Sequence, residues 1–174
     1  MVQLGKDLES FEAELKKNPL DANINFDLAT IHYRLNHIEE AKKFLAKVIF
    51  LNPKDFEATL LLGKIQRKAG DLHFAGETLQ KASKLAPDNG EAWYEKGLVF
   101  SDLGQYDDAI QALQTAFNLS KPHDLVDLPY LRLYIGVLAL AKGDYQLADQ
   151  EVIYLKSHKL DYAKTLQNLI NLSR

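Results

Sequence analysis

The stretch of sequence that decides the fold runs from Gly90 to Ser120 and reads GEAWYEKGLVFSDLGQYDDAIQALQTAFNLS. Bulky and small residues follow one another along it in a fixed order, with a glycine in between. The positions in this order are Trp93, Gly97, Phe100, Gly104, Tyr106, Ala109, Leu113 and Ala116. An ordered set of this kind calls for a search for further copies, because internal repeats determine the whole architecture.

Copies of this pattern precede it at a constant distance. Pro19, Pro53 and Pro87 are equally spaced along the chain, and each stands where a helical segment is expected to stop. Residues 56–89 repeat the pattern with a turn at Gly70, and residues 22–55 repeat it with asparagine at position 36 in place of the turn glycine. Asparagine tolerates the left-handed conformation that ends a helix, so we expect the turn to be kept.

The ordered positions and the even spacing of the prolines resemble the tetratricopeptide repeat, in which one copy of the motif follows another at a fixed period. The resemblance implies an all-α fold, a right-handed superhelical solenoid of antiparallel helix pairs with about ten helices, in which four full repeats lie between two end helices. One helix pair cannot bury its apolar face alone, so neighbouring pairs must stack. We expect the small residues of the two helices of a pair to face each other at the crossing, Gly63 against Ala75 and Gly97 against Ala109 for example, because close helix axes exclude large side chains there.

After Ser120 the period is interrupted. The turn glycines Gly104 and Gly143 lie further apart in the sequence than Gly70 and Gly104 do, and the additional residues fall in 121–127. Pro122 is expected to stop one helix and Asp127 to cap the next, which predicts a longer loop between the third and fourth repeats.

These boundaries predict a single domain over residues 1–174. Its segments are a cap or half-repeat helix at 3–18, repeats at 22–55, 56–89, 90–121 and 127–159, and a capping helix at 160–173. The N-terminal helix carries an apolar stripe of Leu4, Leu8, Phe11 and Leu15. It is either an end cap or the second half of a repeat whose first half is absent.

Composition and charge exclude several classes of function. The formal net charge of −3, without long runs of one sign, argues against nonspecific nucleic-acid binding. Cysteine is absent, which removes disulfides and thiolate chemistry. The first residues lack the features of a secretory signal and no apolar run is long enough to span a bilayer, so we expect a soluble chain without membrane insertion. The compartment stays open, with the cytoplasm as the expectation.

The resemblance also implies which residues of the first helices line a groove for a partner. They are Phe26, Thr30, Tyr33, Arg34, Leu60, Lys64, Arg67, Lys68, Tyr94, Leu98, Ser101, Tyr130, Leu133 and Val137. This face is basic and aromatic near its start and apolar near its end. Apolar residues on a water-facing surface usually mark an interaction site. The alternative is that neighbouring helices bury some of them, and that the basic cluster is ordinary surface charge.

No constellation for catalysis or metal binding is visible. The five histidines show no pair at the one-turn spacing of a helical metal site, and neither a phosphate-binding loop nor a nucleophile motif is present. The carboxylate clamp of chaperone-binding relatives is also missing, because the equivalent positions read Phe26, Thr30, Leu61, Glu91 and Glu95. We therefore expect no enzyme activity, no cofactor, no metal and no binding of a chaperone tail.

The resulting hypothesis is a non-catalytic protein–protein interaction module whose groove takes an extended or helical partner segment. Apolar side chains of the partner would contact Tyr94, Leu98, Leu133 and Val137, and an acidic flank would lie toward Lys64, Arg67 and Lys68. One alternative is a scaffold that self-assembles through its end helices. Another is a substrate-recruiting part of a larger enzyme or of a secretion or envelope assembly system.

Overall fold

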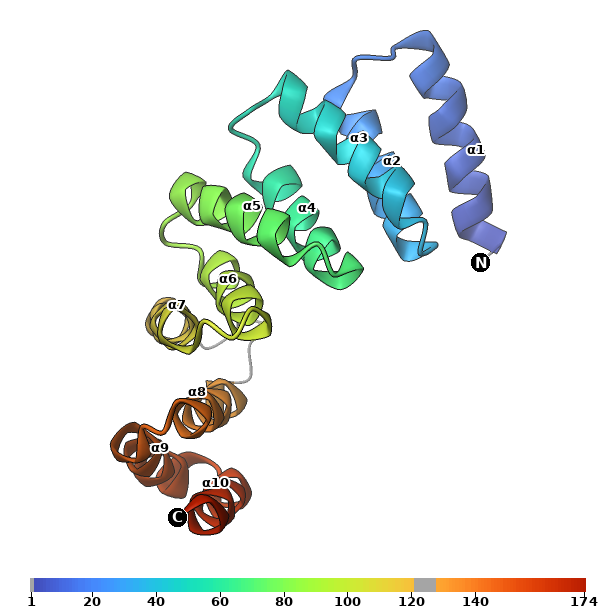
Figure 1. Cartoon of the computed structure of the whole chain (residues 1–174). Coiled ribbons are helices and arrows are strands. Elements are labelled where there is room, and N and C mark those ends of the chain that lie inside the picture. Colours follow the sequence, from blue (N-terminus) through green and yellow to red (C-terminus); the bar gives the residue numbers. More distant parts are fainter. Residues whose placement is uncertain (1, 121–127) are drawn as a thin grey trace. The chain divides into compact units, whose positions relative to one another are not determined.

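The computed structural model describes residues 2–120 and 128–174, and within these residues the chain forms ten helices and no strand (Figure 1). It divides into two compact units, Met1–Pro87 and Asp88–Arg174. The first unit contains α1 (Val2–Lys17), α2 (Ala22–Arg34), α3 (Ile38–Leu51), α4 (Phe56–Ala69) and α5 (Leu72–Leu85). The second contains α6 (Gly90–Asp102), α7 (Tyr106–Leu119), α8 (Leu128–Lys142), α9 (Tyr145–His158) and α10 (Leu160–Ser173).

The all-α class with about ten helices, expected from the repeat pattern, is confirmed. The predicted Pro122 stop, the Asp127 cap and the loop at 121–127 lie outside the described residues. The grouping of all repeats into a single domain and the handedness of a superhelix stay predictions.

The helices begin where short polar side chains follow the repeated prolines. Asp21, Asp55 and Asn89, each two residues after a proline, accept hydrogen bonds from backbone amides in the first turns of α2, α4 and α6. Such a cap supplies an acceptor for amides that have no partner inside the helix. The regularly spaced prolines and caps are therefore a repeated signal that ends one helix and starts the next.

The turns inside the helix pairs share one backbone conformation. Gly70, Gly104 and Gly143 have positive φ, and Asn36 occupies the same position with φ 62°. The expectation that asparagine replaces the turn glycine in the left-handed region is confirmed. Its side chain is tolerated there at a smaller steric cost than that of most other residues.

Unit 1 is organised around α2, α3 and α4. Its core cluster consists of Ala29, Ala41, Leu45, Val48, Ala58 and Ile65. The helix α1 packs against α2, and its residues Leu8, Phe11 and Leu15 are half-buried. The alanines let the helices approach closely while the leucine, valine and isoleucine fill the space between them.

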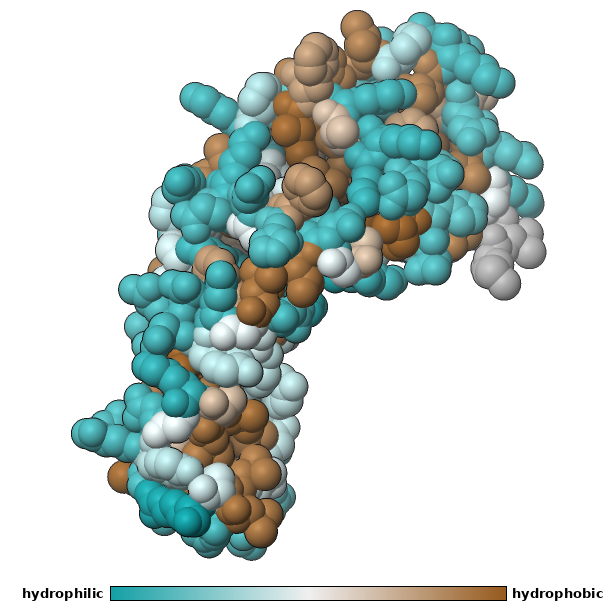
Figure 2. All heavy atoms as spheres, viewed as in Figure 1, coloured by the Kyte–Doolittle hydropathy of each residue, from teal (hydrophilic) through white to brown (hydrophobic). Residues whose placement is uncertain are grey.

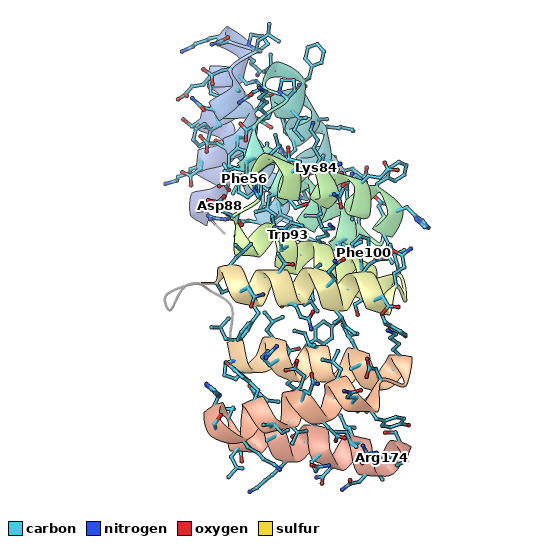
Figure 3. All side chains as sticks on the ribbon, turned by 90° about the vertical axis from the view of Figure 1, so that its left-hand side faces the viewer. Phe56, Lys84, Asp88, Trp93, Phe100 and Arg174 are labelled. Carbon is cyan, nitrogen blue, oxygen red and sulfur yellow. The ribbon has the colours of Figure 1, made fainter. Side chains whose placement is uncertain are left out.

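Unit 2 has a larger core that reaches from α7 to the last helix. Leu113 of α7, Leu131 and Ile135 of α8, Leu155 of α9 and Leu166 of α10 are all fully buried in it. The last helix packs against both α8 and α9. Its end is tied to α9, because the Tyr145 hydroxyl donates to the Ser173 carbonyl at 2.6 Å and Arg174, labelled in Figure 3, forms an ion pair with Asp149 at 2.6 Å.

The close helix crossings are present, and the side chain nearest to Gly63 and to Gly97 is that of a leucine. A Cβ added to Gly63 would lie 2.5 Å from Leu79, and one added to Gly97 would lie 2.7 Å from Leu113. The backbone oxygen of Ala109 would also lie 3.3 Å from a Cβ on Gly97, so Ala109 faces Gly97 as predicted, and the leucine is the contact that the prediction did not include. Leucine side chains in a helix lean toward its N-terminus, so a leucine one turn later reaches back to the crossing point.

Candidate partner-binding surface

In unit 1, two predicted site residues, Tyr33 of α2 and Lys68 of α4, meet near the C-terminal ends of these helices. The Lys68 amino group lies 4.8 Å from the ring centroid of Tyr33, and Arg34 is exposed at the end of α2. Lys64 and Arg67 are half-buried. Cations at helix C-termini are stabilised by the helix dipole, which accounts for part of this clustering without any ligand.

Two further predicted residues of unit 1, both on α2, are half-buried. Phe26 is half-buried against the core cluster, and the Thr30 hydroxyl donates to the Phe26 carbonyl at 3.1 Å. Phe26 thus helps to pack α2 on the core, whereas the Thr30 bond lies within α2 itself. Neither has a side chain that is largely exposed.

Leu60 does not lie on a water-facing surface, and the prediction that it does is wrong. Only 4% of this residue is exposed. Its neighbours Ala58 and Thr59 are buried as well, and three consecutive buried residues span roughly 200° of a helix at about 100° per residue. The first turn of α4 is therefore enclosed on more than one side, which the assignment of a single inner face did not anticipate.

In unit 2, α6 and α8 are joined by a hydrogen bond between two side chains. The hydroxyl groups of Ser101 and Tyr134 lie 2.6 Å apart. Tyr94, Leu133 and Val137 are half-buried and pack against the core, whereas Leu98 is half-buried outside that cluster. The structure thus brings the predicted unit 2 residues onto two connected helices, but their apolar side chains are partly covered.

Tyr130 is the most exposed of the predicted apolar and aromatic residues in unit 2, at 48%. Its ring is nearly parallel to that of Tyr134, with centroids 6.5 Å apart and an interplanar angle of 7°. It meets the ring of Tyr162 from α10 edge-on, at 6.4 Å and 71°. We call these three residues the tyrosine cluster.

Figure 2 shows apolar residues gathered over α8 and α10 on the visible face.

A second polar feature of unit 2 lies inside the helix stack. Arg132 Nε is 3.0 Å from Glu151 Oε2, and only 2% of the Glu151 side chain is exposed. The Arg132 guanidinium lies 4.5 Å from the Phe117 ring centroid and 4.6 Å from that of Tyr154. Burial raises the pKa of Glu151 to about 6, and the nearby charge of Arg132 lowers it by less. The short distance is a charge contact without a well-directed hydrogen bond, so it compensates the burial only in part.

A histidine pair spans the turn between α2 and α3. The Nδ1 atoms of His32 and His37 lie 3.4 Å apart, and the buried His32 ring stacks on Phe44 at 5.3 Å. Sequence reasoning missed this pair because it considered one-turn spacings within a helix, whereas the left-handed Asn36 folds the chain back. In residues 2–120 and 128–174, no group of three or more potential metal-ligating side chains comes together.

The comparisons with known proteins point to one fold. A family model described as Anaphase-promoting complex, cyclosome, subunit 3 matches residues 36–116, which is less than half of the chain. BBSome complex member BBS4 of Bos taurus is 31% identical over 106 residues, or 61% of this chain and 20% of that protein. The chain spans only 20% to 24% of the length of the curated relatives that it matches.

Solved structures resemble the chain over nearly its whole length. The crystal structure of MamA has a TM-score of 0.79 at 22% identity, and the match covers 95% of this chain and 89% of that one. YrrB, described as a TPR protein with an unusual peptide-binding site, has a TM-score of 0.75 at 18% identity, with 98% of this chain and 82% of that one covered. The chain has the fold of the tetratricopeptide repeat proteins. At these identities, the likeness to the solved structures concerns the fold.

The chain shows two features that the repeat pattern did not predict. Tyr134 and Tyr162 complete the tyrosine cluster, and the one available signal for Tyr134 is its one-turn spacing from Tyr130. The Arg132–Glu151 pair had no signal in the sequence, because the repeat pattern prescribes neither residue. In the part of the chain that the structure describes, no helix combines the length and apolar character needed to cross a membrane.

Proposed function

We propose that this chain is a non-catalytic protein–protein interaction module that binds a partner segment on α6 and α8 of unit 2. The observation that carries the proposal is the set of half-buried apolar side chains Tyr94, Leu98, Leu133 and Val137, bordered by the exposed Tyr130. A partner segment that covers them would remove further apolar surface from water. YrrB, which is similar in fold, is described as having a peptide-binding site, and this supports the proposal by analogy.

Preorganisation favours this use of the surface. The Asn89 side chain caps α6, the Ser101–Tyr134 hydrogen bond fixes α6 to α8, and side chains of both helices pack in or against the core of unit 2. A rigid receptor loses little conformational entropy when a ligand binds. The partner segment then bears most of the ordering cost, whether it binds as an extended chain or as a helix.

The basic residues of unit 1 are the proposed place for an acidic flank of the partner. Lys64, Arg67 and Lys68 lie on α4, with Arg34 exposed on α2. Lys68 contacts the Tyr33 ring, so an acidic group here has to compete with that contact or add to it. This part of the proposal is electrostatic, and we expect it to weaken at high salt.

A peptide display experiment tests the proposal. Random peptides are selected on the whole chain, and the affinity of each selected peptide is measured by calorimetry for the parent, Leu98→Asp and Ile153→Asp. Ile153 is the matched control because it lies on α9 and is exposed. We expect at least tenfold weaker binding to Leu98→Asp and unchanged binding to Ile153→Asp, since about 1.4 kcal/mol of lost apolar contact corresponds to that factor. Peptides that bind all three proteins equally contradict the proposal, provided that circular dichroism shows the same helix content.

Self-assembly through the last helix is a second candidate, supported by one observation. Leu160, Leu169 and Leu172 of α10 are exposed, Leu172 at 85%. An end helix with exposed leucines can receive another copy of the chain. Sedimentation at increasing concentration tests this candidate. It predicts association in the parent that Leu172→Asp reduces, and a parent that stays monomeric refutes it.

A third possibility concerns the role of the chain within a longer protein. The curated relatives are four to five times as long as the matching part, since the chain spans 20% to 24% of them. In such a context the proposed surface would recruit a substrate or an assembly partner for other parts of the protein. The same display experiment applies, because recruitment requires the same binding surface.

A further inference from the structure

The tyrosine cluster presents aromatic rings from two helices at one place. Tyr130 and Tyr134 lie one turn apart on α8 with rings only 7° from parallel, and Tyr162 of α10 meets Tyr130 at 71°. Two of the rings are nearly parallel, and the third meets one of them edge-on. The negative potential of an aromatic ring lies over its face, and a cation within about 6 Å of the centroid is attracted to it.

Two members of the cluster are held in place, and the third is half exposed. The Tyr134 hydroxyl is fixed by Ser101 at 2.6 Å, and Tyr134 and Tyr162 pack against the core of unit 2. Tyr130, by contrast, is 48% exposed. An exposed ring supported by two less exposed rings gives a binding surface that needs little rearrangement to accept a ligand.

The protein itself already places a cation at this cluster. The Lys159 amino group lies 5.7 Å from the Tyr162 ring centroid. The two cations of α8 are engaged elsewhere, since Arg132 pairs with Glu151 and Lys142 with Asp107. The sequence of unit 2, residues 88–174, contains twelve acidic and eight basic residues. Its charge balance therefore favours a positively charged partner over a negatively charged one.

We propose that the tyrosine cluster binds an arginine side chain of the partner segment. Arginine suits the site better than lysine because its flat guanidinium stacks on ring faces and is less strongly hydrated than an ammonium group. The proposal rests on the proposed function and deepens it, because it assigns a chemical class to one position of the partner. It also distinguishes the two units, since an acidic flank is expected at unit 1 and a basic residue at unit 2.

The test uses a small probe that does not depend on the rest of the partner. N-acetyl-arginine methylamide is titrated into the whole chain, and the tyrosine ring signals are followed by nuclear magnetic resonance. N-acetyl-citrulline methylamide is the matched probe, with nearly the same shape and no charge. We expect the arginine probe to shift the Tyr130 ring signals with an affinity about 5 to 30 times that of the citrulline probe. Equal affinities of the two probes overturn the proposal.

Two variants separate the ring face from the hydroxyl group. Tyr130→Phe keeps the ring and should bind the arginine probe within about twofold of the parent, whereas Tyr130→Leu should bind it about 5 to 30 times more weakly. Because Tyr130 is half exposed, both variants should fold, and circular dichroism verifies this. Unchanged binding to Tyr130→Leu, or an equal loss in both variants, overturns the proposal.

Failure of the arginine site can be distinguished from failure of the proposed interaction function. Selected peptides that depend on Leu98 but contain no enriched arginine, together with no preference for the arginine probe, refute the cation site and leave the interaction module intact. Binding of the arginine probe through Tyr130 without any Leu98-dependent peptide supports the cation site and contradicts the wider binding surface on α6 and α8.

Discussion

Gly97 on α6 and Leu113 on α7 approach so closely that a Cβ on Gly97 would lie 2.7 Å from Leu113 Cγ. It would also lie 3.3 Å from the backbone oxygen of Ala109, which cannot move independently of α7. In the helix pair of the third repeat, the Leu113 side chain therefore occupies the space that a side chain at position 97 would need. Both residues are buried, so the contact is a property of the interior.

Replacement of this glycine should destabilise unit 2. For Gly97→Ala we expect a steric cost of about 1–3 kcal/mol, offset by about 1 kcal/mol because alanine is the better helix former. The matched control is Gly5→Ala in α1, where nothing lies within 4 Å of the added Cβ, and this change should be neutral or stabilising. Urea unfolding monitored by circular dichroism measures both. A Gly97→Ala protein as stable as Gly5→Ala would contradict the crossing geometry.

The Ser101–Tyr134 hydrogen bond should couple α6 to α8 energetically. Tyr134→Phe and Ser101→Ala each remove one partner of a contact of 2.6 Å. In a double-mutant cycle we expect a coupling free energy of about 0.5–1.5 kcal/mol. Additive effects of the two substitutions would show that the hydroxyl groups do not stabilise one another.

Glu151 should make unit 2 less stable as pH rises through the weakly acidic range. Its pKa is raised from 4.5 to about 6 in the folded chain, so the folded state holds the proton more tightly than the unfolded state. The contribution is fully present below about pH 4.5 and is lost as pH rises through about 6, with a magnitude of roughly 2 kcal/mol. Glu151→Gln cannot titrate, so the stability of this variant relative to the parent should improve over that range. Parallel pH profiles of the two proteins would refute the assignment.

His32 should produce the opposite dependence in unit 1. Burial and then the neighbouring His37 lower its pKa, while Glu40 on α3 and Glu12 on α1 raise it by less. The unfolded chain therefore takes up the proton first, and stability present above about pH 6.5 is lost as pH falls. Unfolding at roughly pH 7 and pH 5 should show a smaller loss in His32→Leu than in the parent. An equal loss of unfolding free energy in both proteins on acidification would contradict the role of His32.

The repeat pattern predicts the fold well because its signals are local and occur several times. A cap two residues after each repeated proline and a left-handed residue at each turn determine where helices start and stop, and Asn36 obeys this rule as the glycines do. These signals act within a few residues, so they can be read from the sequence without knowledge of the packing.

The candidate site could be predicted less well because it depends on contacts between helices. Leu60 was expected at the surface but is enclosed, and Tyr162 joins Tyr130 from a helix that lies well beyond α8 in the sequence, with α9 in between. The Arg132–Glu151 pair likewise spans two helices. Such contacts depend on how neighbouring repeats stack, which a repeat signature does not specify.

Tryptophan and tyrosine, the residues that dominate ultraviolet absorption and fluorescence, are distributed very unevenly between the two units. Trp93, labelled in Figure 3, is the single tryptophan, and its ring centroid lies 4.4 Å from the Lys96 amino group. Tyr33 is the one tyrosine in the sequence of unit 1, whereas the other seven belong to unit 2. Ultraviolet absorption and fluorescence therefore report almost entirely on unit 2. Unit 1 contributes little to either signal, so a chain in which only unit 1 had unfolded would still show the absorption and fluorescence of a folded protein.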